Sequence, residues 1–546
     1  MLFIIFSLFY IITIDASTNF NLNGTWCCEE TTVIQYGTNL FTNASYGNGV
    51  GTITNNFIVM NFTNSPSLIN GTVDSACTTI TWSNGAIWTK SFWPGPATNA
   101  PSWVDTLMIY ELNPKGYTSP NGTGDGSGSG TWVSLIQQLP YLNDLGITSL
   151  WVAGSVAAEV HFYNIWTVYA TRDPTILDSS LGTNQDFLTF VQTAHSYNIK
   201  VFLDVVTHGI CNDSPFISQH PDWFVSGSWG MTDYNYTNPE FFQWWNNTWN
   251  SYILNYQIDG YRLDIADTDW ELHGFDGAAL TGQAINHEVA IFGESRRYHF
   301  MQHDSMFSTG SFYDMTAIFQ NTPCYYTTQI SCHDSGWESA PGNYYAIQGS
   351  RAWFGYAGIF SYNIPVWFGG EEFNAQPVSL PNLQKDLYGG GGPGGWMYGT
   401  QLQWDQLQNN TQMAMYQDTK HMIMIAKQEA DVIHRNRCNT SITRITIDQS
   451  ATLGTVPYAR YIPGVKAICI FANTDETKDA TITATFPLAT MNMNSYSQFL
   501  LTDLWGSNGN NTITVSNAQL QNYTIQVPRD KIAGGGLAVF RLVPQS

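Results

Sequence analysis

The sequence predicts an α/β protein built on a (β/α)₈ TIM barrel with a small insertion after the third barrel strand. An N-terminal β domain and a C-terminal antiparallel β domain flank the barrel. Three observations predict this. The 546 residues are too many for one ordinary core. Strand-like runs alternate with helix-length amphipathic stretches in the middle of the chain, and short alternating segments stand on either side. The expected parts are a signal peptide (1–16), an N-terminal β domain (17–100), the barrel (101–435, insertion about 208–248) and a C-terminal β-sandwich (436–546).

The first residues predict a secretory leader. Residues 1–14 are nearly all apolar, and Asp15-Ala16-Ser17 follows them. Such a run has the length of a signal-peptide core and is too short to cross a bilayer. We therefore expect cleavage near Ala16, and a protein that is secreted or reaches the lumen of the secretory or lysosomal pathway. No later run has the length and apolarity of a transmembrane helix, so we expect no membrane anchor.

Glycosylation motifs and cysteines agree with that route. Asn-x-Ser/Thr occurs in all regions, for example at Asn246 and Asn409. Eight cysteines without a Cys-x-x-Cys pair predict disulfides rather than a zinc site, but the sequence leaves their connectivity open. The pairs we consider are Cys324–Cys332, Cys438–Cys469 and one of Cys27 or Cys28 with Cys77, which leaves Cys211 for the other.

Both ends of the chain predict β structure. Near the N-terminus Phe57–Phe62 and Thr79–Trp82 alternate, and Asn84-Gly85 is a hairpin signal. Pro94-Gly-Pro96 marks a linker. After a helix over Met413–Val432, strand-like runs predict the C-terminal domain: Ile442–Ile447, Lys466–Ala472, Thr481–Phe486 and Leu537–Leu542.

The middle of the chain predicts the barrel. Candidate strands at Leu107–Tyr110, Thr148–Val152 and Lys200–Val206 are separated by helical stretches at Trp132–Leu145 and Phe187–Tyr197. This alternation indicates a parallel sheet with crossover helices, and its length up to residue 435 suits eight such units. The later interval from 294 to 334 is short for two helices and a strand, so we expect the barrel to be irregular or incomplete there.

The charge balance restricts the partners. Acidic residues outnumber basic ones 42 to 20, which gives a net charge of −22. Such a surface repels phosphate backbones and anionic lipids, so nucleic acids and membrane surfaces are poor candidates. A neutral substrate fits better.

Three acidic residues close predicted strands of the barrel. Asp264 ends Asp259–Asp264, Glu294 ends Glu288–Glu294, and Asp334 ends Thr328–Asp334. Functional groups of such barrels lie at the C-terminal strand ends. Two carboxyl groups facing one bond are what glycosidic cleavage requires, one as nucleophile and one as acid and then base.

These stretches resemble the α-amylase family, glycoside hydrolase family 13. Tyr261-Arg262-Leu263-Asp264 resembles the family's second signature, Phe292-Gly293-Glu294 the third and His333-Asp334 the fourth. Leu203-Asp204-Val205-Val206 resembles the first, and His161-Phe162-Tyr163 resembles the family's His-Gly-Tyr. The resemblance covers about residues 104–435 and implies a (β/α)₈ barrel that cleaves α-glucosidic bonds. It implies Asp264, Glu294 and Asp334 as catalytic residues, and Arg262, His333, Tyr163, Asp204 and His208 as substrate-binding residues.

The first signature departs from the family pattern. It usually reads Asp-x-x-x-Asn-His, whereas here Asp204 is followed by Val-Val-Thr207-His208-Gly209. The family's Asn commonly binds a structural calcium ion, so that site and a substrate role of His208 are both open. The chemistry itself requires no cofactor, and we expect a monomer acting on an α-glucan or oligosaccharide.

Three functional interpretations follow from the resemblance. The first is a retaining hydrolase of starch-type or glycogen-type α-glucans. The second is an α-glucan transglycosylase or an exo-acting α-glucosidase, and the third is a catalytically silent carbohydrate-binding relative. The N-terminal β domain is either a carbohydrate-binding module, with Trp82 and Trp88 as stacking residues, or a packing domain.

Overall fold

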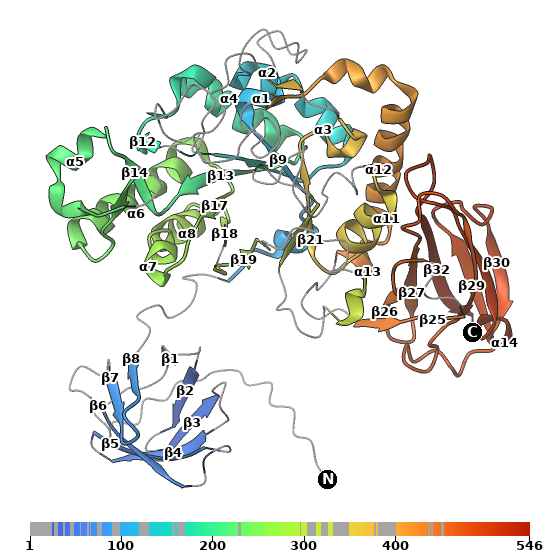
Figure 1. Ribbon diagram of the computed structural model, residues 1–546, viewed down its shortest axis with the longest axis horizontal. Coiled ribbons are helices and arrows are strands. Elements are labelled where there is room, and N and C mark those ends of the chain that lie inside the picture. Colours follow the sequence, from blue (N-terminus) through green and yellow to red (C-terminus); the bar gives the residue numbers. More distant parts are fainter. Residues whose placement is uncertain are drawn as a thin grey trace. The chain divides into compact units, whose positions relative to one another are not determined.

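The computed structural model is described over a large part of the chain (Figure 1). The described residues are 24–26, 31–36, 39–43, 49–54, 56–62, 65, 67–73, 79–89, 99–118, 130–154, 159–160, 169, 171–227, 231–294, 296–302, 313–317, 326–330, 333, 349–375, 378–379, 400–434, 437, 441–448 and 453–545. The chain forms two compact units, Met1–Ala97 and Thr98–Ser546, and each is described by itself. The expected signal peptide lies outside the described residues.

The N-terminal unit is an antiparallel meander, in which each strand pairs with the next along the chain. Its strands are β1 (Gly24–Trp26), β2 (Thr31–Tyr36), β3 (Asn39–Asn43), β4 (Gly49–Thr54), β5 (Phe57–Phe62), β6 (Ile69–Val73), β7 (Thr79–Trp82) and β8 (Ile87–Thr89). The predicted hairpin joins β7 to β8, and Gly85 takes a left-handed φ of 88° there.

The structure decides between the two roles considered for the tryptophans of this unit. Trp82 and Trp88 are only 4% and 3% exposed, and they pack edge to face with each other and with Phe62. Their rings belong to the apolar core of the meander. They are therefore packing residues and offer no face on which a sugar could stack.

Eight parallel strands form the barrel. They are β9 (Ile109–Leu112), β10 (Ser149–Val152), β13 (Lys200–Val206), β17 (Gly260–Asp264), β18 (Ala290–Gly293), β19 (Phe300–Met301), β20 (Thr327–Gln329) and β21 (Ile364–Phe368). Each pairs in parallel with its neighbour, and β21 returns to β9. A parallel bridge between Met301 and Tyr326 closes the ring between β19 and β20. Buried side chains such as Trp151, Phe202, Phe292 and Phe300 fill the interior, so the barrel is a packed core.

Helices of unequal length surround these strands. They are α1 (Pro114–Tyr117), α2 (Trp132–Ile136), α3 (Leu139–Leu145), α4 (Asn184–Ser196), α6 (Pro239–Tyr256), α7 (Asp269–His273), α8 (Asp276–Ala284), α11 (Arg351–Trp353), α12 (Asn410–Gln428) and α13 (Ala430–Ile433). Short 3₁₀ or π turns cover Ser102–Thr106, Ser179–Leu181, Phe354–Ile359, Glu371–Phe373 and Trp404–Gln408. Small two-stranded ribbons join β11 (Glu159–Val160) to β12 (Thr171–Asp173) and β22 (Val378–Ser379) to β23 (Thr400–Gln401). No helix in the described part of the chain is long and apolar enough to span a bilayer.

The barrel is irregular where the sequence indicated it. Only residues 294–299 separate β18 from β19, and those of them that are described form no helix. The loop folds straight back, because the His299 N–H donates to the Ile291 carbonyl and the His299 ring accepts from the Ile291 N–H. The crossover helix expected after the fifth strand is replaced by this loop. The strand expected to run from 328 to 334 is β20, which already ends at Gln329.

A small antiparallel sheet forms the insertion after β13. It contains β14 (Gly209–Cys211), β15 (Phe224–Val225) and β16 (Met231–Tyr234), with α5 (Pro215–Gln219) and a 3₁₀ turn at Pro221–Trp223. The next helix, α6, begins at Pro239, before the expected boundary at 248. Asn238 fixes this start, because its side chain accepts hydrogen bonds from the N–H groups of Glu240 and Phe241.

The C-terminal domain packs a six-stranded sheet against a three-stranded one. Its strands are β24 (Ser441–Arg444), β25 (Thr446–Ile447), β26 (Tyr458–Ile462), β27 (Lys466–Ala472), β28 (Ala480–Thr485), β29 (Gln498–Asp503), β30 (Thr512–Ser516), β31 (Tyr523–Val527) and β32 (Leu537–Gln545), with α14 (Asn517–Leu520). The sequence missed β26 and β29–β31.

Two expected disulfide partners are free thiols. Cys469 lies fully buried in the apolar core of the C-terminal sandwich, and Cys211 is buried in the insertion. Burial raises the pKa of the Cys211 thiol to about 12 and that of Cys469 further. The pairing of Cys469 with Cys438 and the pairing assigned to Cys211 are therefore wrong. The other six cysteines lie outside the described residues.

Candidate active site

Arg262 is the centre of a buried polar cluster at the C-terminal end of β17. It stands two residues before Asp264, so both side chains point to the same side of the strand. Its Nη1 lies 2.6 Å from Asp264 Oδ1 and 3.1 Å from Asp204 Oδ1. Its Nη2 lies 2.9 Å from Glu294 Oε2. One guanidinium thus joins carboxylates from three neighbouring strand ends, β13, β17 and β18.

Asp204 holds the arginine rather than facing open space. It is fully buried, and its Oδ2 accepts hydrogen bonds from Trp151 Nε1 at 2.9 Å and from the Tyr169 hydroxyl at 2.6 Å. The Gly154 N–H donates to the same oxygen at 3.3 Å. With both oxygens engaged, Asp204 supports the cluster. This arrangement favours a role for Asp204 in holding Arg262 over the direct substrate contact that the resemblance implies.

Glu294 also accepts a hydrogen bond from the backbone of a strained residue, Ile265. The Ile265 N–H donates to Glu294 Oε2 at 2.8 Å, and Ile265 has φ of 46°. A β-branched side chain rarely adopts this left-handed conformation, which costs about 1–3 kcal/mol. Strain of this kind persists where surrounding contacts enforce it, and here it aims a backbone N–H at a carboxylate next to Asp264.

The electrostatics of the cluster are unbalanced. Burial raises the pKa of Asp264 well above its usual value, and the charges of Glu294 and Asp204 raise it further, against the opposing effect of Arg262. Three carboxyl groups share one guanidinium in a buried site, and burial together with the neighbouring acidic charges favours the protonated form of Asp264.

His333 contacts a residue that the sequence did not reveal as functional. Its Nδ1 forms a hydrogen bond with Oε1 of Glu111, a fully buried residue of β9. The imidazole stacks on Tyr169, with ring centroids 4.8 Å apart and planes at 17°. Glu111 fixes the tautomer and orientation of the ring. A charged residue inside the apolar run from 107 to 112 was the available signal for Glu111.

The remaining predicted residues have different outcomes. Tyr163 and Asp334 lie outside the described residues. His208 is mostly buried, which lowers its pKa, and its Nδ1 lies 3.8 Å from Asp233 Oδ1. It is close enough to Glu294 for that charge to act on it.

The sequence leaves a structural calcium ion open. Ca²⁺ takes 6–8 oxygen ligands. In the described part of the chain no group of three or more His, Cys, Asp or Glu side chains could hold a metal ion. The structural calcium ion therefore stays a prediction, and no step below uses one.

Comparison with known proteins gives a consistent picture. Residues 114–225 match the family model "Alpha amylase, catalytic domain". The intracellular maltogenic amylase of Bacillus subtilis is 26% identical over 207 residues, which are 31% of this chain and 34% of that protein. Neopullulanase 2 of Thermoactinomyces vulgaris is 25% identical over 210 residues, 31% of this chain and 35% of that protein. The chain thus matches about a third of the length of these curated relatives.

Solved structures extend the similarity to most of the chain at the level of the fold. The α-amylase from Geobacillus thermoleovorans, complexed with acarbose, has a TM-score of 0.60 at 15% identity, covering 82% of this chain and 100% of that one. The maltogenic α-amylase AmyB from Thermotoga neapolitana has a TM-score of 0.56 at 16% identity, covering 81% and 99%.

Proposed function

Because the barrel belongs to the α-amylase family, we propose that this chain is a retaining glycoside hydrolase. Its substrates would be the α-glucosidic bonds of starch-type or glycogen-type α-glucans. The observation that carries the proposal is the single guanidinium of Arg262, which lies 2.6 Å from Asp264 and 2.9 Å from Glu294. The two carboxyl groups are held side by side, as one glycosidic bond requires.

In this proposal Asp264 is the nucleophile. Arg262 stabilises its carboxylate and orients one oxygen, which leaves the other for the anomeric carbon. Attack forms a covalent glycosyl-enzyme, and water then hydrolyses it. Burial raises the pKa of Asp264 in the free chain, so substrate binding must favour its ionised form before it attacks.

Glu294 is the proposed acid and base. Its Oε2 is bound by Arg262 and by the Ile265 N–H, so Oε1 is the oxygen from which a proton can pass to the leaving oxygen. Its side chain is 14% exposed, so water can reach it for the second step. After bond cleavage the same carboxylate removes a proton from the attacking water.

His333 and Asp334 would bind hydroxyl groups of the reacting sugar, and Tyr163 would stack on its ring. Glu111 holds His333 at Nδ1 and thereby orients the imidazole ring. Hydrogen bonds of this kind accelerate the reaction when they strengthen as the sugar approaches an oxocarbenium ion.

The test is hydrolysis of a panel of α-linked glucans by the wild-type chain and by Glu294→Gln. The proposal is supported if the wild-type chain releases reducing ends with retained anomeric configuration and the variant releases none. Turnover that is equal in both chains contradicts it and favours a silent carbohydrate-binding relative. Maltoheptaose separates the alternatives. Internal fragments would identify endo-hydrolysis, and longer chains would identify transglycosylation. Glucose as the sole product would identify an exo-acting α-glucosidase.

We also propose that the chain is secreted or enters the secretory or lysosomal lumen as a glycosylated monomer. The apolar leader and the sequons support this, although two of the expected disulfide partners are free. The sequon at Asn246 is a poor acceptor in the folded chain, because its amide donates to the His273 carbonyl at 3.3 Å. Ser17 as the first residue of the mature protein, and a monomer mass by light scattering, would support the proposal; an intact Met1 would contradict it.

A further inference from the structure

The loop between β18 and β19 sends an arginine back over the segment that follows the proposed nucleophile. Arg296 stands two residues after Glu294, and its Nε donates to the carbonyl oxygen of Asp267. Its Nη1 lies 3.1 Å from Oδ1 of Asp269. Both acceptors belong to residues 265–269, which lead from the end of β17 to the start of α7. One guanidinium therefore joins the loop after the proposed acid to the segment after the proposed nucleophile.

This contact extends the pairing of β17 with β18 beyond the ends of the two strands. The last paired residues are Leu263 and Gly293, and the Glu294 N–H then donates to the Leu263 carbonyl at 3.0 Å. The Ile265 N–H donates to Glu294 Oε2 at 2.8 Å. The guanidinium of Arg296 adds the next contact, two residues further along each segment. The two loops are thus joined at successive points, with the proposed acid between them.

The strained backbone of Ile265 requires support of this kind. Its φ of 46° is one that a β-branched residue adopts only where neighbouring contacts enforce it. On the N-terminal side, the Thr207 hydroxyl donates to the Asp264 carbonyl at 2.6 Å. On the C-terminal side, Thr268 caps α7, and the guanidinium of Arg296 holds the carbonyl that precedes this cap. Ile265 is therefore held from both sides, and Arg296 contributes to the C-terminal side.

The loop that carries Arg296 has a fixed backbone. A Cβ atom at Gly293 would lie 2.1 Å from the Arg296 carbonyl oxygen, so a larger residue would push the loop away from the strand. At the other end of the loop, His299 forms a backbone and a ring hydrogen bond with Ile291. The side chain of Arg296 therefore starts from a defined position, although its outer part is exposed.

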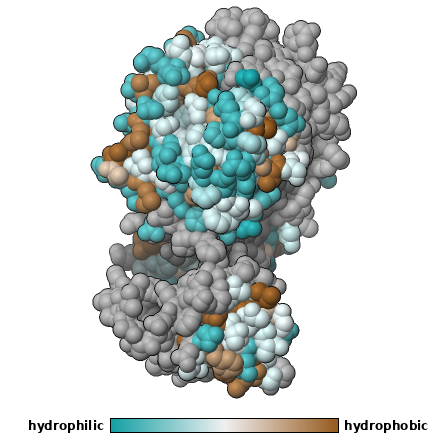
Figure 2. Space-filling view, turned by 90° about the vertical axis from the view of Figure 1, so that its left-hand side faces the viewer, coloured by the Kyte–Doolittle hydropathy of each residue, from teal (hydrophilic) through white to brown (hydrophobic). Residues whose placement is uncertain are grey.

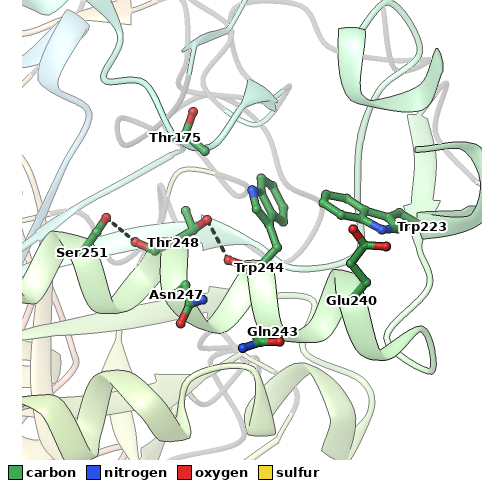
Figure 3. Close-up of a pocket in the computed structure, with 8 residues that line it drawn as sticks. All are labelled: Thr175, Trp223, Glu240, Gln243, Trp244, Asn247, Thr248 and Ser251. Carbon is green, nitrogen blue, oxygen red and sulfur yellow. Dashed lines mark hydrogen bonds between the residues drawn. The ribbon is translucent and has the colours of Figure 1, made fainter. Parts of the chain in front are cut away.

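Other features of the surface do not account for this arrangement. Arg296 is 48% exposed, and an exposed ion pair such as that with Asp269 contributes little to stability. The side of the molecule that carries the insertion is mostly hydrophilic or neutral, with scattered apolar residues (Figure 2), which does not suit an apolar protein interface. The cavity of about 440 Å³ on α6 is lined, among the described residues, by side chains from α6, the insertion and the segment after β12 (Figure 3). The contacts of Arg296 with the segment after β17 are separate from both.

We propose that Arg296 is a positioning residue for the reaction. It holds residues 265–269 so that the strained Ile265 keeps its N–H on Glu294 Oε2, and the acid stays beside the nucleophile. Arg296 acts through this N–H and not by contact with the reacting atoms. The inference rests on the proposed function of Glu294 as the acid. Because a misplacement of about 1 Å can slow a reaction strongly, loss of the contact affects turnover more than stability.

The test measures the turnover of two substrates by Arg296→Ala in the full-length chain. For both substrates kcat/KM reports the first step. An unactivated maltooligosaccharide requires protonation of its leaving oxygen, so its kcat/KM should fall about tenfold. An aryl α-maltoside with an acidic phenol does not, so its kcat/KM should fall by less than about twofold. A residue that merely stabilises the fold would lower both values equally, and the urea midpoint should stay at that of wild type.

Two further variants separate the guanidinium contact from a general effect of an exposed charge. Arg529→Ala is the matched control, because Arg529 is 43% exposed and pairs with Asp479 at 3.9 Å in the C-terminal domain. It should leave both kcat/KM values at those of wild type. Arg296→Lys keeps the positive charge and one donor group, so it should recover part of the loss on the maltooligosaccharide.

Hydrogen exchange gives a readout that does not require activity. Amide exchange in peptides that cover residues 264–269 should be faster in Arg296→Ala and unchanged in Arg529→Ala. The inference is overturned if Arg296→Ala turns over both substrates as wild type does, if both kcat/KM values fall equally, or if exchange in this segment is unchanged. If the wild-type chain hydrolyses neither substrate, the proposed function is contradicted, and the exchange result alone then decides whether Arg296 holds the segment.

Discussion

The two ends of β17 each bury an aspartate, and the two carboxyl groups behave in opposite ways. Asp259, just before the strand, accepts hydrogen bonds from Lys200 at 2.9 Å and the Val201 N–H, with His195 at 2.7 Å. These neighbours lower its pKa despite the burial. Asp264, at the other end, shares one arginine with two further acids, and its pKa is raised.

The difference lies in the ratio of cations to carboxylates. At the N-terminal end one carboxylate faces Lys200 and two histidines, so its charge is compensated and the cluster stabilises the fold. At the C-terminal end three carboxylates face Arg262, and the uncompensated charge keeps a proton in the site. Barrels of this type carry stability at the first end and chemistry at the second. Sequence alone placed both aspartates in one strand, whereas the partners that separate them come from other strands and helices.

The largest expected effect is that of Asp264→Asn. An amide cannot attack the anomeric carbon, so kcat on an α-glucan should fall by about 10⁴-fold or more, as for other groups that form the covalent intermediate. Asp259→Asn, at the opposite end of the same strand, is the matched control and should retain the parental kcat at a temperature where it is folded. Equal losses in the two variants would show that the strand, and not the nucleophile, was responsible.

Glu294→Gln should have a smaller effect that depends on the leaving group. General acid catalysis contributes about 10²–10⁴-fold, and an amide can still bind the Ile265 N–H through its oxygen. Hydrolysis of unactivated α-glucans should therefore fall by that factor. In aryl glycosides with an acidic phenol, the phenolate leaves without protonation. The rate of their first step should therefore fall much less. A loss that is the same for both substrates would contradict the assignment of Glu294 as the acid.

Asp259→Asn should instead affect stability. Removing one partner of a buried ion pair leaves uncompensated charge, and because Lys200 and His195 are about one-third exposed we expect a loss of about 3 kcal/mol, the low end for such sites. Since the folded pKa is below the unfolded one, this contribution is present at neutral pH and disappears as the pH falls through the folded pKa. Urea unfolding at pH 7 and at pH 3 measures both. The exposed pair of Arg172 with Asp213 provides the control, because Asp213→Asn should change stability by less than about 1 kcal/mol.

The sequence predicted the elements that depend on local patterns. The strand that contains Asp204 and the strand that ends in Asp264 could be located, because apolar runs and turn residues bound them. Arg262 stands two residues before Asp264, and this spacing alone places the two side chains on one side of the strand. These features follow from spacing along one strand.

What the sequence could not give depends on contacts between distant segments. Glu111 and Tyr169 meet His333 and Asp204 only after the barrel closes, and no local pattern marks them as partners. The sequence left the role of Trp82 and Trp88 open, because an alternating strand has the same pattern whether its apolar face meets solvent or a packed core. The strained Ile265 was also invisible, since φ is imposed by its surroundings.

Glu372 completes the comparison, because it is a fully buried carboxyl group whose hydrogen-bond partners carry no positive charge. It accepts hydrogen bonds from the hydroxyls of Tyr110 at 3.0 Å and Tyr141 at 2.7 Å and from the Gly370 N–H. Burial raises its pKa from 4.5 to about 7, against the effect of these hydrogen bonds. The unfolded chain therefore releases its proton at lower pH than the folded chain.

The direction in which stability changes with pH follows from the higher pKa of Glu372 in the folded chain. Below pH 4.5 both states are protonated, and stability then falls as the pH rises to about 7, by about 3 kcal/mol in total, and is constant above it. Glu372→Gln should remove the part of this slope that Glu372 causes, whereas Glu271, whose pKa is also near 7, keeps its own part. At pH 8 the variant should be more stable than wild type by about 2 kcal/mol, because the neutral amide avoids the cost of a buried charge but loses part of the hydrogen bonding. Urea midpoints from pH 4 to pH 8 check both. A slope in Glu372→Gln as steep as that of wild type would contradict the assignment to Glu372.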